Sequence, residues 1–373
     1  MRIAILSCFY PYRGGIAQFN ASLFNELSKQ HNIKGFNFTR QYPNLLFPGK
    51  TQYVTKQDIA IQVPSHRVLD SINPISYLKS VREITEWKPD LLIMRYWNTF
   101  FAPSLGYVGR GVRKSGTKVI SILDNVIPHE RRFYDTPFTK YFLTSSDAYI
   151  VLSGAVGDEL LHLKPDANFK IIPHPVYNHF GEKIPREEAL KKLKLNTDKK
   201  NILFFGLIRE YKGLDILTEA FNKLDDSYQL IIAGEPYGSF EKYEALINAS
   251  PAKDRIKLFT RYISDAEVPV FFSAADVVVL PYRTATQSGI SAVSHHFNVP
   301  MVTTNVGGLK EAIGETGTGV VVDEPEAEKV AEGIISFFEG GKREEYIKAI
   351  EKLKESLSWE QFAVKLIDFY NEI

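Results

Sequence analysis

Two cations follow an apolar segment that ends in glycine. In the stretch NILFFGLIREYKGLDIL, residues 201–217, Gly206 closes the apolar run, Arg209 and Lys212 come next, and Gly213 precedes a helical pattern. The N-terminus of a helix presents unpaired N–H groups that attract anions, and two cations beside it suit a diphosphate. The spacing differs from the G-x-x-x-x-G-K-[ST] loop of nucleotide triphosphatases. The alternative is that both cations are solvated loop residues, as most lysines and arginines are.

A second loop has the composition of a phosphate-binding turn. Gln287, Ser288 and Gly289 follow the apolar run at 276–282, and the glycines at 307–308 follow the next apolar run. Small residues allow backbone N–H groups to approach a phosphate closely. Ordinary strand-to-helix turns would have the same composition, so both interpretations stay open.

Two more glycine positions follow apolar runs. Gly14 and Gly15 precede a helical pattern near the start of the chain, but the segment is not G-x-G-x-x-G and no acidic residue follows for a ribose. A dinucleotide site is therefore not favoured there. Gly234 and Glu235 end the run at 228–234 and either line a base pocket or form an ordinary turn.

The elements that would position these loops alternate between strand-length apolar runs and helix-period segments. This alternation predicts an α/β fold with two doubly wound parallel-sheet domains. The expected strands are 2–7, 90–97, 117–123, 148–153 and 169–173, then 201–206, 228–234, 255–259, 276–282, 300–304 and 319–322.

The last helix should be strongly amphipathic. Ser358 and Gln361 have capping-box spacing, and Trp359, Phe362 and Leu366 begin one apolar face. Such a helix needs a partner surface, either on its own domain or on the first one.

Composition excludes several classes of protein. The 373 residues include 45 Lys+Arg against 44 Asp+Glu, so bulk charge gives no argument for nucleic acid. Cys8 is the single cysteine, which fits a reducing compartment. No apolar run approaches the roughly 20 residues of a membrane span, and the first residues lack a signal-peptide core. A soluble cytoplasmic chain is expected.

Metal chemistry is not indicated. His174 and His179 lie near the expected hinge, and His295 and His296 lie on a helix, but no third ligand stands at useful spacing. There is no D-x-D segment either. We expect structural histidines and a reaction without metal or other cofactor.

Three segments together resemble a known family. GLIREYKG, PYRTATQSG and VGGLKE are similar to the signatures of the retaining GT-B glycosyltransferases of family 4, the group 1 family, and the order of motifs extends from YPYRGG to SWEQFA. The resemblance implies two Rossmann-like domains facing across a cleft. Residues 1–180 would form the acceptor side, with the helix 358–373 crossing back to it, and residues 198–357 would hold a nucleotide diphosphate-sugar.

The resemblance also implies the reaction. A sugar would pass to a glycan or lipid-linked acceptor with retention of configuration, in the synthesis of a cell-surface polysaccharide or glycoconjugate. Because no carboxylate is placed as a nucleophile, we expect a front-face displacement in which the leaving phosphate takes the acceptor proton. No metal would be needed, since Arg209 and Lys212 would neutralise the charge on the leaving diphosphate. The remaining donor-binding positions would be Gly14, Gly15, Gly206, Gly234, Glu235, Gln287, Ser288, Gly289 and Ile290.

The chain departs from the family pattern at two places. The family usually has two glutamates where this chain has Ala285 and Val293, and Val293 cannot accept hydrogen bonds from a ribose. Family members often have a histidine where this chain has Asp124, and His129 follows five residues later. We count Asp124 and His129 among the catalytic candidates. For His129 the reason is that an imidazole can bind the sugar or share an acceptor proton. A histidine that merely caps the loop is the alternative.

The sequence leaves open two alternatives to a glycosyltransferase, and it also indicates a contact with a membrane. A non-catalytic sugar- or nucleotide-binding partner subunit would explain Val293 and Asp124, whereas a two-lobed solute-binding protein would require an export signal. The apolar residues 45–47 and the basic residues Arg110, Arg113 and Lys114 would suit a peripheral contact with the inner membrane face and a lipid-linked acceptor. A loop packed on its own domain and a solvated helix end are the alternative.

Overall fold

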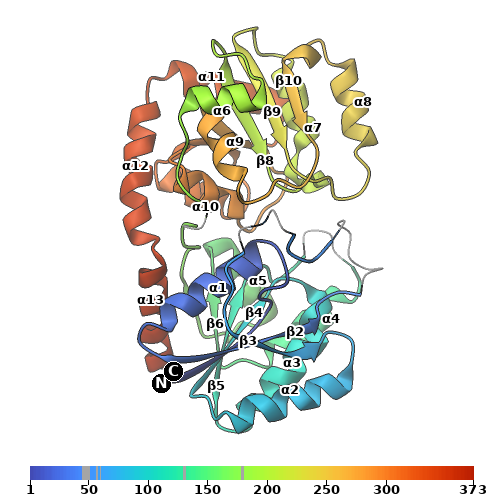
Figure 1. Cartoon of the computed structure of the whole chain (residues 1–373), viewed down its shortest axis with the longest axis vertical. Helices are drawn as coiled ribbons and strands as arrows, with labels where there is room; N and C mark the ends of the chain where they lie inside the picture. Colours follow the sequence, from blue (N-terminus) through green and yellow to red (C-terminus); the bar gives the residue numbers. More distant parts are fainter. Residues whose placement is uncertain (44–50, 56–57, 59, 129–131, 178–179) are drawn as a thin grey trace. The chain divides into compact units, whose positions relative to one another are not determined.

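The computed structural model describes residues 1–43, 51–55, 58, 60–128, 132–177 and 180–373. The chain divides into two compact units. Unit 1 comprises Met1–Thr55, Ala60–Pro175 and Leu357–Ile373, and unit 2 is formed mainly by Val176–Ser356. Figure 1 gives the labels of the elements used below.

Unit 1 contains a seven-stranded parallel sheet in the order β3-β2-β1-β4-β5-β6-β7. Its strands are β1 (Arg2–Leu6), β2 (Asn32–Arg40), β3 (Ser65–Asp70), β4 (Leu91–Tyr96), β5 (Lys118–Leu123), β6 (Ala148–Val151) and β7 (Phe169–Ile171). The direction of strand addition reverses between β1 and β4. At such a switch point the loops after the two central strands diverge and leave room for a ligand.

The helices of unit 1 cover both faces of this sheet. They are α1 (Gly15–Leu27), α2 (Pro74–Glu86), η2 (Thr99–Phe101), α3 (Ala102–Arg113), α4 (Asp135–Leu143), α5 (Gly154–Leu163) and α13 (Trp359–Glu372). A hydrophobic core lies on each face of this sheet. Successive side chains of a strand point to opposite faces, so the residues of β1 alternate between the two cores. Ile3 and Ile5 pack with α1 and α13, whereas Ala4 and Leu6 pack beneath the other helices.

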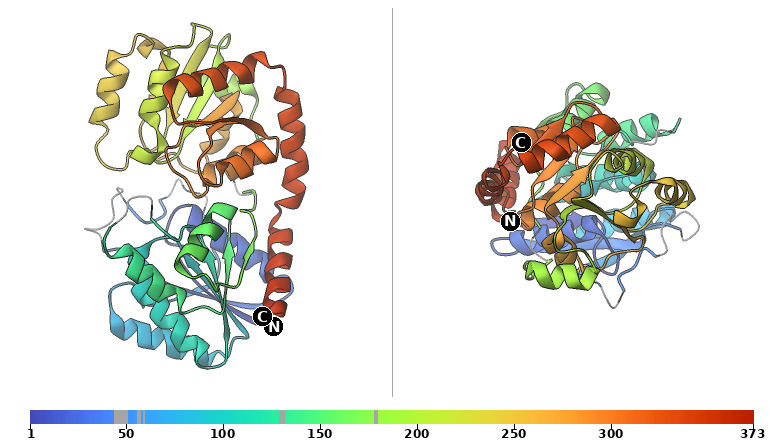
Figure 2. Two further views of the ribbon diagram at one scale, coloured as in Figure 1. Left: turned by 180° about the vertical axis from the view of Figure 1, so that it is seen from behind. Right: turned by 90° about the horizontal axis from the view of Figure 1, so that it is seen from above.

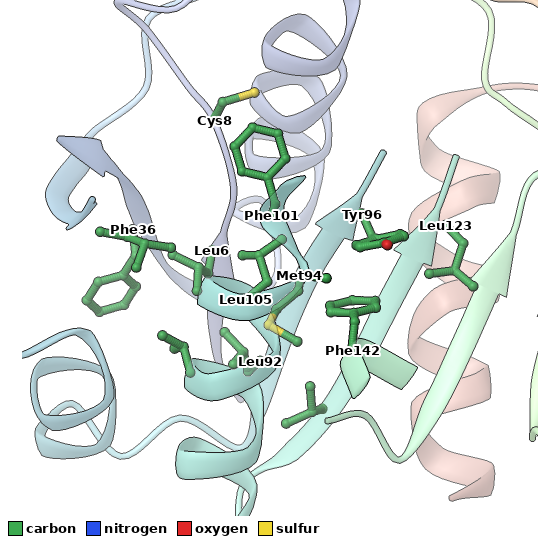
Figure 3. Close-up of a cluster of buried hydrophobic side chains, with 14 of the residues drawn as sticks. Leu6, Cys8, Phe36, Leu92, Met94, Tyr96, Phe101, Leu105, Leu123 and Phe142 are labelled. Carbon is green, nitrogen blue, oxygen red and sulfur yellow. The ribbon is translucent and has the colours of Figure 1, made fainter. Parts of the chain in front are cut away.

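The second of these cores is rich in aromatic and aliphatic side chains. Figure 3 shows Leu6, Met94 and Leu105 between the sheet and α3, with the stacked rings of Tyr96 and Phe142 alongside. The ring centroids of that pair are 4.1 Å apart. This packing fixes the carboxyl end of β4, where Tyr96 is the last residue.

Helix α13 packs on α1 within unit 1, and Figure 2 shows it, at the red end of the colour scale, beside the unit 1 sheet. Ser358 caps the helix by accepting a hydrogen bond from the Gln361 N–H at 3.1 Å. The rings of Trp359 and Phe362 lie 4.8 and 5.4 Å from that of Phe19 in α1. The apolar face that the sequence predicts is therefore covered by the first helix of the chain.

Unit 2 contains a six-stranded parallel sheet in the order β10-β9-β8-β11-β12-β13, with its switch point between β8 and β11. Its strands are β8 (Lys200–Phe205), β9 (Tyr228–Ala233), β10 (Ile256–Phe259), β11 (Val277–Leu280), β12 (Met301–Thr304) and β13 (Gly319–Val322). Its helices are α6 (Arg186–Leu193), η3 (Glu210–Lys212), α7 (Leu214–Phe221), α8 (Glu241–Ala249), η4 (Lys253–Arg255), α9 (Val268–Ala274), α10 (Gly289–His296), the π-helix η5 (Lys310–Glu315), α11 (Ala327–Glu339) and α12 (Arg343–Ser356).

The predicted class of two doubly wound parallel sheets is confirmed. All eleven strands expected from the sequence are present, and the structure adds β2 and β3. Polar and charged residues occupy much of both added strands, and β3 is an edge strand. A continuous apolar run is the signal of a central parallel strand, and these two lack it. No helix among the described residues is long and apolar enough to cross a membrane.

Candidate functional site

The loop after β8 brings Gly206, Lys212 and Ile290 together. Gly206 has a φ of 97°, and a Cβ added there would lie 3.4 Å from the Lys212 Nζ and 2.9 Å from the Ile290 Cδ1. Glycine therefore leaves the lysine ammonium room beside the backbone at the end of β8. Since β8 borders the switch point, Lys212 lies where an open parallel sheet binds ligands.

Lys212 is a buried cation. Its residue is only 8% exposed, and burial lowers the pKa of its ammonium to about 8, with the charge of Arg209 contributing. An ammonium in this position has lost most of its hydration, so an anionic ligand beside it would restore stabilisation of its charge. The sequence predicts the lysine, but its burial depends on the surrounding loops.

Arg209 lies against aromatic rings of the same unit. Its guanidinium carbon is 3.9 Å from the ring centroid of Tyr237 and 5.7 Å from that of Tyr211. Stacking on Tyr237 orients the planar guanidinium, which leaves its edge as the hydrogen-bonding side. Tyr237 is 38% exposed and follows the end of β9.

An ion pair fastens the loop of the two cations to the loop after β11. Arg283 donates to both carboxylate oxygens of Asp215, at 2.9 and 2.8 Å, and to the Glu210 carbonyl at 3.0 Å. The backbone N–H of Arg283 also donates to the Tyr211 carbonyl at 2.7 Å. A bidentate pair restricts geometry in two directions, so Arg283 holds the backbone that carries Arg209 and Lys212. Sequence reasoning missed this clamp.

The predicted second loop leads into α10 at the same switch point. The Ser288 Oγ accepts from the Ile290 N–H at 3.3 Å and lies 3.2 Å from the Tyr282 hydroxyl. Gly289 is exposed, and a Cβ added there would meet nothing closer than the Tyr177 hydroxyl at 3.8 Å. Gln287 is half-buried just before the cap. Tyr282 also links the loops, because its ring centroid is 5.6 Å from the Lys212 Nζ.

Gly234 and Glu235 lie beside the same site. A Cβ added to Gly234 would fall 1.8 Å from the Gly206 carbonyl oxygen, so only glycine permits this approach of the two strand ends. The Ile208 N–H donates to the Glu235 carbonyl at 2.9 Å, and Glu235 is 5% exposed. The predicted residues of unit 2 thus gather around the ends of β8, β9 and β11.

The positions of the two missing glutamates are apolar in this chain. Ala285 and Val293 are both buried and belong to one hydrophobic core with Tyr282 and Leu309. A Cβ added to Gly307 would lie 1.4 Å from the Ala285 carbonyl, which shows how tightly the loop after β12 packs here. Val293 is therefore a core residue, and the described contacts give it no polar role.

The glycine loop of unit 1 lies at the switch point of the first sheet. Gly14 has a φ of 105°, and nothing lies within 4 Å of a Cβ added there. Gly15 begins α1 directly after it. The amide of Asn20 donates to the Ser7 Oγ and the Cys8 carbonyl at 2.8 and 2.9 Å, which ties α1 to the end of β1.

Asp124 follows β5 and forms a buried ion pair with Arg95 of β4. Arg95 Nε and Nη2 donate to its two oxygens at 2.7 and 2.5 Å, and both residues are less than a tenth exposed. The Arg95 guanidinium also lies 3.6 Å from the ring centroid of Phe19. The pair therefore holds the Asp124 side chain in a fixed orientation. The one sequence signal for Arg95 was a charge inside the apolar run DLLIMRYW.

The structure describes some, but not all, of the histidines named in the sequence analysis. His129 and His179 lie outside the described residues. His174 is half-buried in unit 1, where desolvation, with a contribution from the charge of Arg95, lowers its pKa to about 4. His295 is buried in unit 2 at 3.2 Å from the Thr318 hydroxyl, and burial lowers its pKa to about 4 as well. Across the described ranges, no three His, Cys, Asp or Glu side chains are grouped to hold a metal ion.

Comparisons with known proteins relate this chain to glycosyltransferases. The family model "Glycosyl transferases group 1" matches residues 185–353. The chain is 24% identical over 381 residues to an uncharacterized glycosyltransferase of Methanocaldococcus jannaschii, with 100% of this chain and 99% of that protein covered. It is also 24% identical over 223 residues to the D-inositol 3-phosphate glycosyltransferase of Xylanimonas cellulosilytica, a match that covers 59% of this chain and 52% of that protein.

Solved structures share the fold over the whole chain. The structure of Anabaena HepE in complex with UDP-glucose superposes with a TM-score of 0.78 and 15% identity, and the match covers 100% of both chains. The fold is therefore GT-B. The model of the group 1 glycosyltransferases matches most of unit 2.

Proposed function

We propose that this protein transfers a sugar from a nucleotide diphosphate-sugar to a glycan or lipid-linked acceptor with retention of configuration. The donor diphosphate would bind at the switch point of unit 2, between Lys212 and the start of α10. A role in the synthesis of a cell-surface polysaccharide or glycoconjugate is the setting we propose. HepE, which shares the fold, was solved in complex with UDP-glucose, and this supports a nucleotide-sugar as the donor class.

The single observation that carries the proposal is the buried ammonium of Lys212. A cation with a pKa lowered to about 8 by burial is destabilised until an anion reaches it. Gly206 keeps space beside the Nζ, and the clamp of Arg283 on Asp215 holds the backbone around it. A diphosphate oxygen is the ligand that matches this charge and position.

The described residues also suggest how the transfer proceeds. As the bond between the sugar and the diphosphate breaks, negative charge grows on the leaving phosphate, and Lys212 and Arg209 stabilise it more strongly than in the ground state. That charge makes the phosphate oxygen basic enough to take the acceptor proton. Two fixed cations would supply the stabilisation that Mg²⁺ gives elsewhere, so we propose transfer without a metal. Asp124, held in place by Arg95, would bind sugar or acceptor hydroxyls.

A second candidate is a non-catalytic partner subunit that binds nucleotide or sugar on the same fold. Val293 favours it, because a buried valine in the apolar core provides no acceptor for a ribose. Such a subunit would bind donor weakly or not at all when alone and would not turn it over.

The test is calorimetric titration with UDP, GDP, ADP and TDP, with and without a chelator, followed by an assay of donor hydrolysis. We expect micromolar binding of one nucleotide that is indifferent to the chelator. The double variant Arg209→Ala, Lys212→Ala should lose it. Lys242→Ala is the matched control, since this lysine pairs with Asp215 at 3.6 Å on the surface of the same region. No binding of any nucleotide would refute the donor site and favour the partner subunit.

A further inference from the structure

Exposed apolar side chains gather on one helical layer of unit 1. Among the sixteen large apolar side chains that are exposed in the described part of the chain, six come from α2, α3 and the region of α4. They are Ile75, Leu78, Tyr107, Phe133, Phe138 and Tyr141, and we refer to them as the outer helical surface. Phe133 is 95% exposed, Ile75 75% and Leu78 59%. Large apolar groups are rarely left so exposed in a cluster without a partner.

The three helices form one continuous layer because α3 carries glycines at its contacts. A Cβ added to Gly111 would lie 2.6 Å from the Val81 Cγ2 of α2, and one added to Gly106 would lie 2.7 Å from the Tyr141 Cε1 of α4. These glycines allow α2 and α4 to approach α3 closely. The rings of Tyr77 in α2 and Tyr107 in α3 are 6.0 Å apart. Figure 1 shows the three helices next to one another on unit 1.

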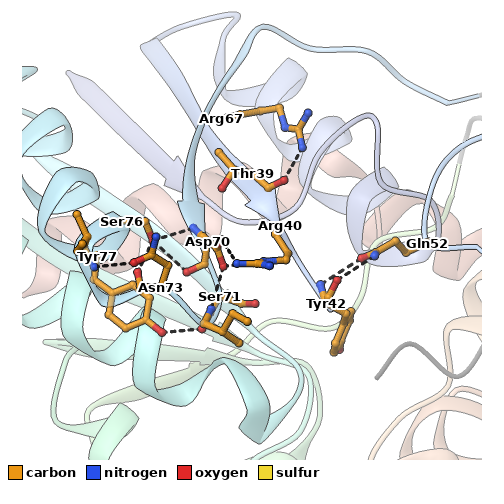
Figure 4. Close-up of polar contacts among 12 residues, drawn as sticks. Thr39, Arg40, Tyr42, Gln52, Arg67, Asp70, Ser71, Asn73, Ser76 and Tyr77 are labelled. Atoms are coloured by element: carbon orange, nitrogen blue, oxygen red, sulfur yellow. Dashed lines mark hydrogen bonds and ion pairs between the residues drawn. The ribbon is translucent and has the colours of Figure 1, made fainter. Parts of the chain in front are cut away.

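The beginning of α2 is rigid, so Ile75 and Leu78 are presented in a fixed orientation. Asn73 accepts from the Ile75 N–H at 3.1 Å, and the Ser76 hydroxyl both accepts from the Asp70 N–H and donates to carbonyls of the preceding turn. The Tyr77 hydroxyl donates to the Ser71 carbonyl at 2.6 Å. Figure 4 shows this network. Ile75 and Leu78 are therefore about one turn apart on a helix whose beginning is held by hydrogen bonds to the preceding turn.

The charge of the layer differs from that of the whole chain. Residues 74–86, 102–114 and 132–144 contain seven basic and three acidic residues, although the full chain has 45 Lys+Arg and 44 Asp+Glu. Of the three acids, Asp135 is buried, Glu83 pairs with His66 and with Lys79, and Glu86 pairs with Arg82. Lys79, Lys114 and Lys140 are exposed. The outer helical surface therefore combines apolar groups with an excess of positive charge.

We infer that the outer helical surface docks on an anionic lipid bilayer. Apolar side chains would enter the boundary between head groups and acyl chains, while the lysines around them contact lipid phosphates. A protein partner could cover the apolar groups, but the unbalanced positive charge favours a surface that is uniformly negative. The helices α2, α3 and α4 all begin at the carboxyl edge of the sheet, because each follows a parallel strand and leads into the next one. Docking through Ile75 and Phe138 would bring that edge close to lipid, where a lipid-linked acceptor is available.

The test is flotation of the full-length chain with vesicles of phosphatidylcholine alone or with about one third phosphatidylglycerol. We expect binding to the anionic vesicles that weakens as salt is added. The variant Ile75→Ser, Leu78→Ser, Phe138→Ser should lose binding about tenfold or more. The control Ile171→Ser, Leu258→Ser, Val364→Ser changes three apolar residues elsewhere that are 41–45% exposed, and it should bind like the wild type.

A charge variant separates the electrostatic part. Lys79→Gln, Lys114→Gln, Lys140→Gln should weaken binding to anionic vesicles and leave UDP affinity unchanged, which keeps this test independent of the donor site. Equal binding by all variants, or none by the wild type, would overturn the proposal. Self-association of the wild type that the apolar variant abolishes, measured by sedimentation equilibrium without vesicle binding, would assign the surface to a second copy of the chain and would also overturn it.

Discussion

Replacing Lys212 by methionine should stabilise the protein while removing donor binding. Burial lowers the pKa of Lys212 from 10.5 to about 8. At about 1.4 kcal/mol for each tenfold change, this fall corresponds to about 3 kcal/mol by which the protonated side chain disfavours the native state. Methionine has a similar length, fills the same space and carries no charge. We expect a gain of about 2–3 kcal/mol in the free energy of unfolding at pH 7.

The gain should depend on pH in a defined direction. Below pH 8 the native and unfolded states both bind the proton, so the charge is a full cost to the wild type. Between pH 8 and 10.5 the native state releases a proton that the unfolded state keeps, and wild-type stability rises with pH. The advantage of Lys212→Met should therefore be largest near pH 7 and small by pH 10.

Differential scanning calorimetry would measure this gain as a change in Tm. The transition to compare is the one whose Tm shifts when UDP is added. A gain of 2–3 kcal/mol would raise the Tm of a unit of this size by about 4–12 °C. Lys242→Met is the control, because its side chain is 56% exposed and a surface substitution changes stability by about 0.5 kcal/mol or less. A Tm that is unchanged or lower in Lys212→Met, with a difference that does not vary with pH, would refute the reasoning.

Three other substitutions test the packing around the sites. Asp124→Asn should destabilise the chain by about 3–5 kcal/mol in urea unfolding, since it leaves the Arg95 charge buried without its partner; a loss below 1 kcal/mol would show that solvent reaches the pair. Val293→Glu should cost about 3 kcal/mol or more and leave UDP affinity unimproved, whereas tighter binding at full stability would mean that this position is open to a ribose. Gly213→Ala places a Cβ 2.0 Å from the Pro281 carbonyl at a φ of 67°, so Tm and UDP affinity should both fall; normal affinity would separate this turn from the site.

The sequence was sufficient for most of the elements because their signals are local. Apolar runs marked eleven strands, and Ser358 with Gln361 marked the start of α13. The glycines at 206 and 213 marked turns that need positive φ, which depends on the residue itself. Polar strands such as β2 gave no such signal, since their pairing with β1 and β3 is what defines them.

Only the tertiary structure shows which charged side chains are paired and which are buried. Asp215 and Arg283 are 68 residues apart in sequence, and Arg95 and Asp124 are 29 apart, yet each pair is joined by two hydrogen bonds. The sequence could propose Lys212 as a phosphate ligand, but its lowered pKa arises from burial by loops that follow different strands. Burial and pairing depend on neighbours that only folding brings together, whereas strands, caps and turns follow from adjacent residues.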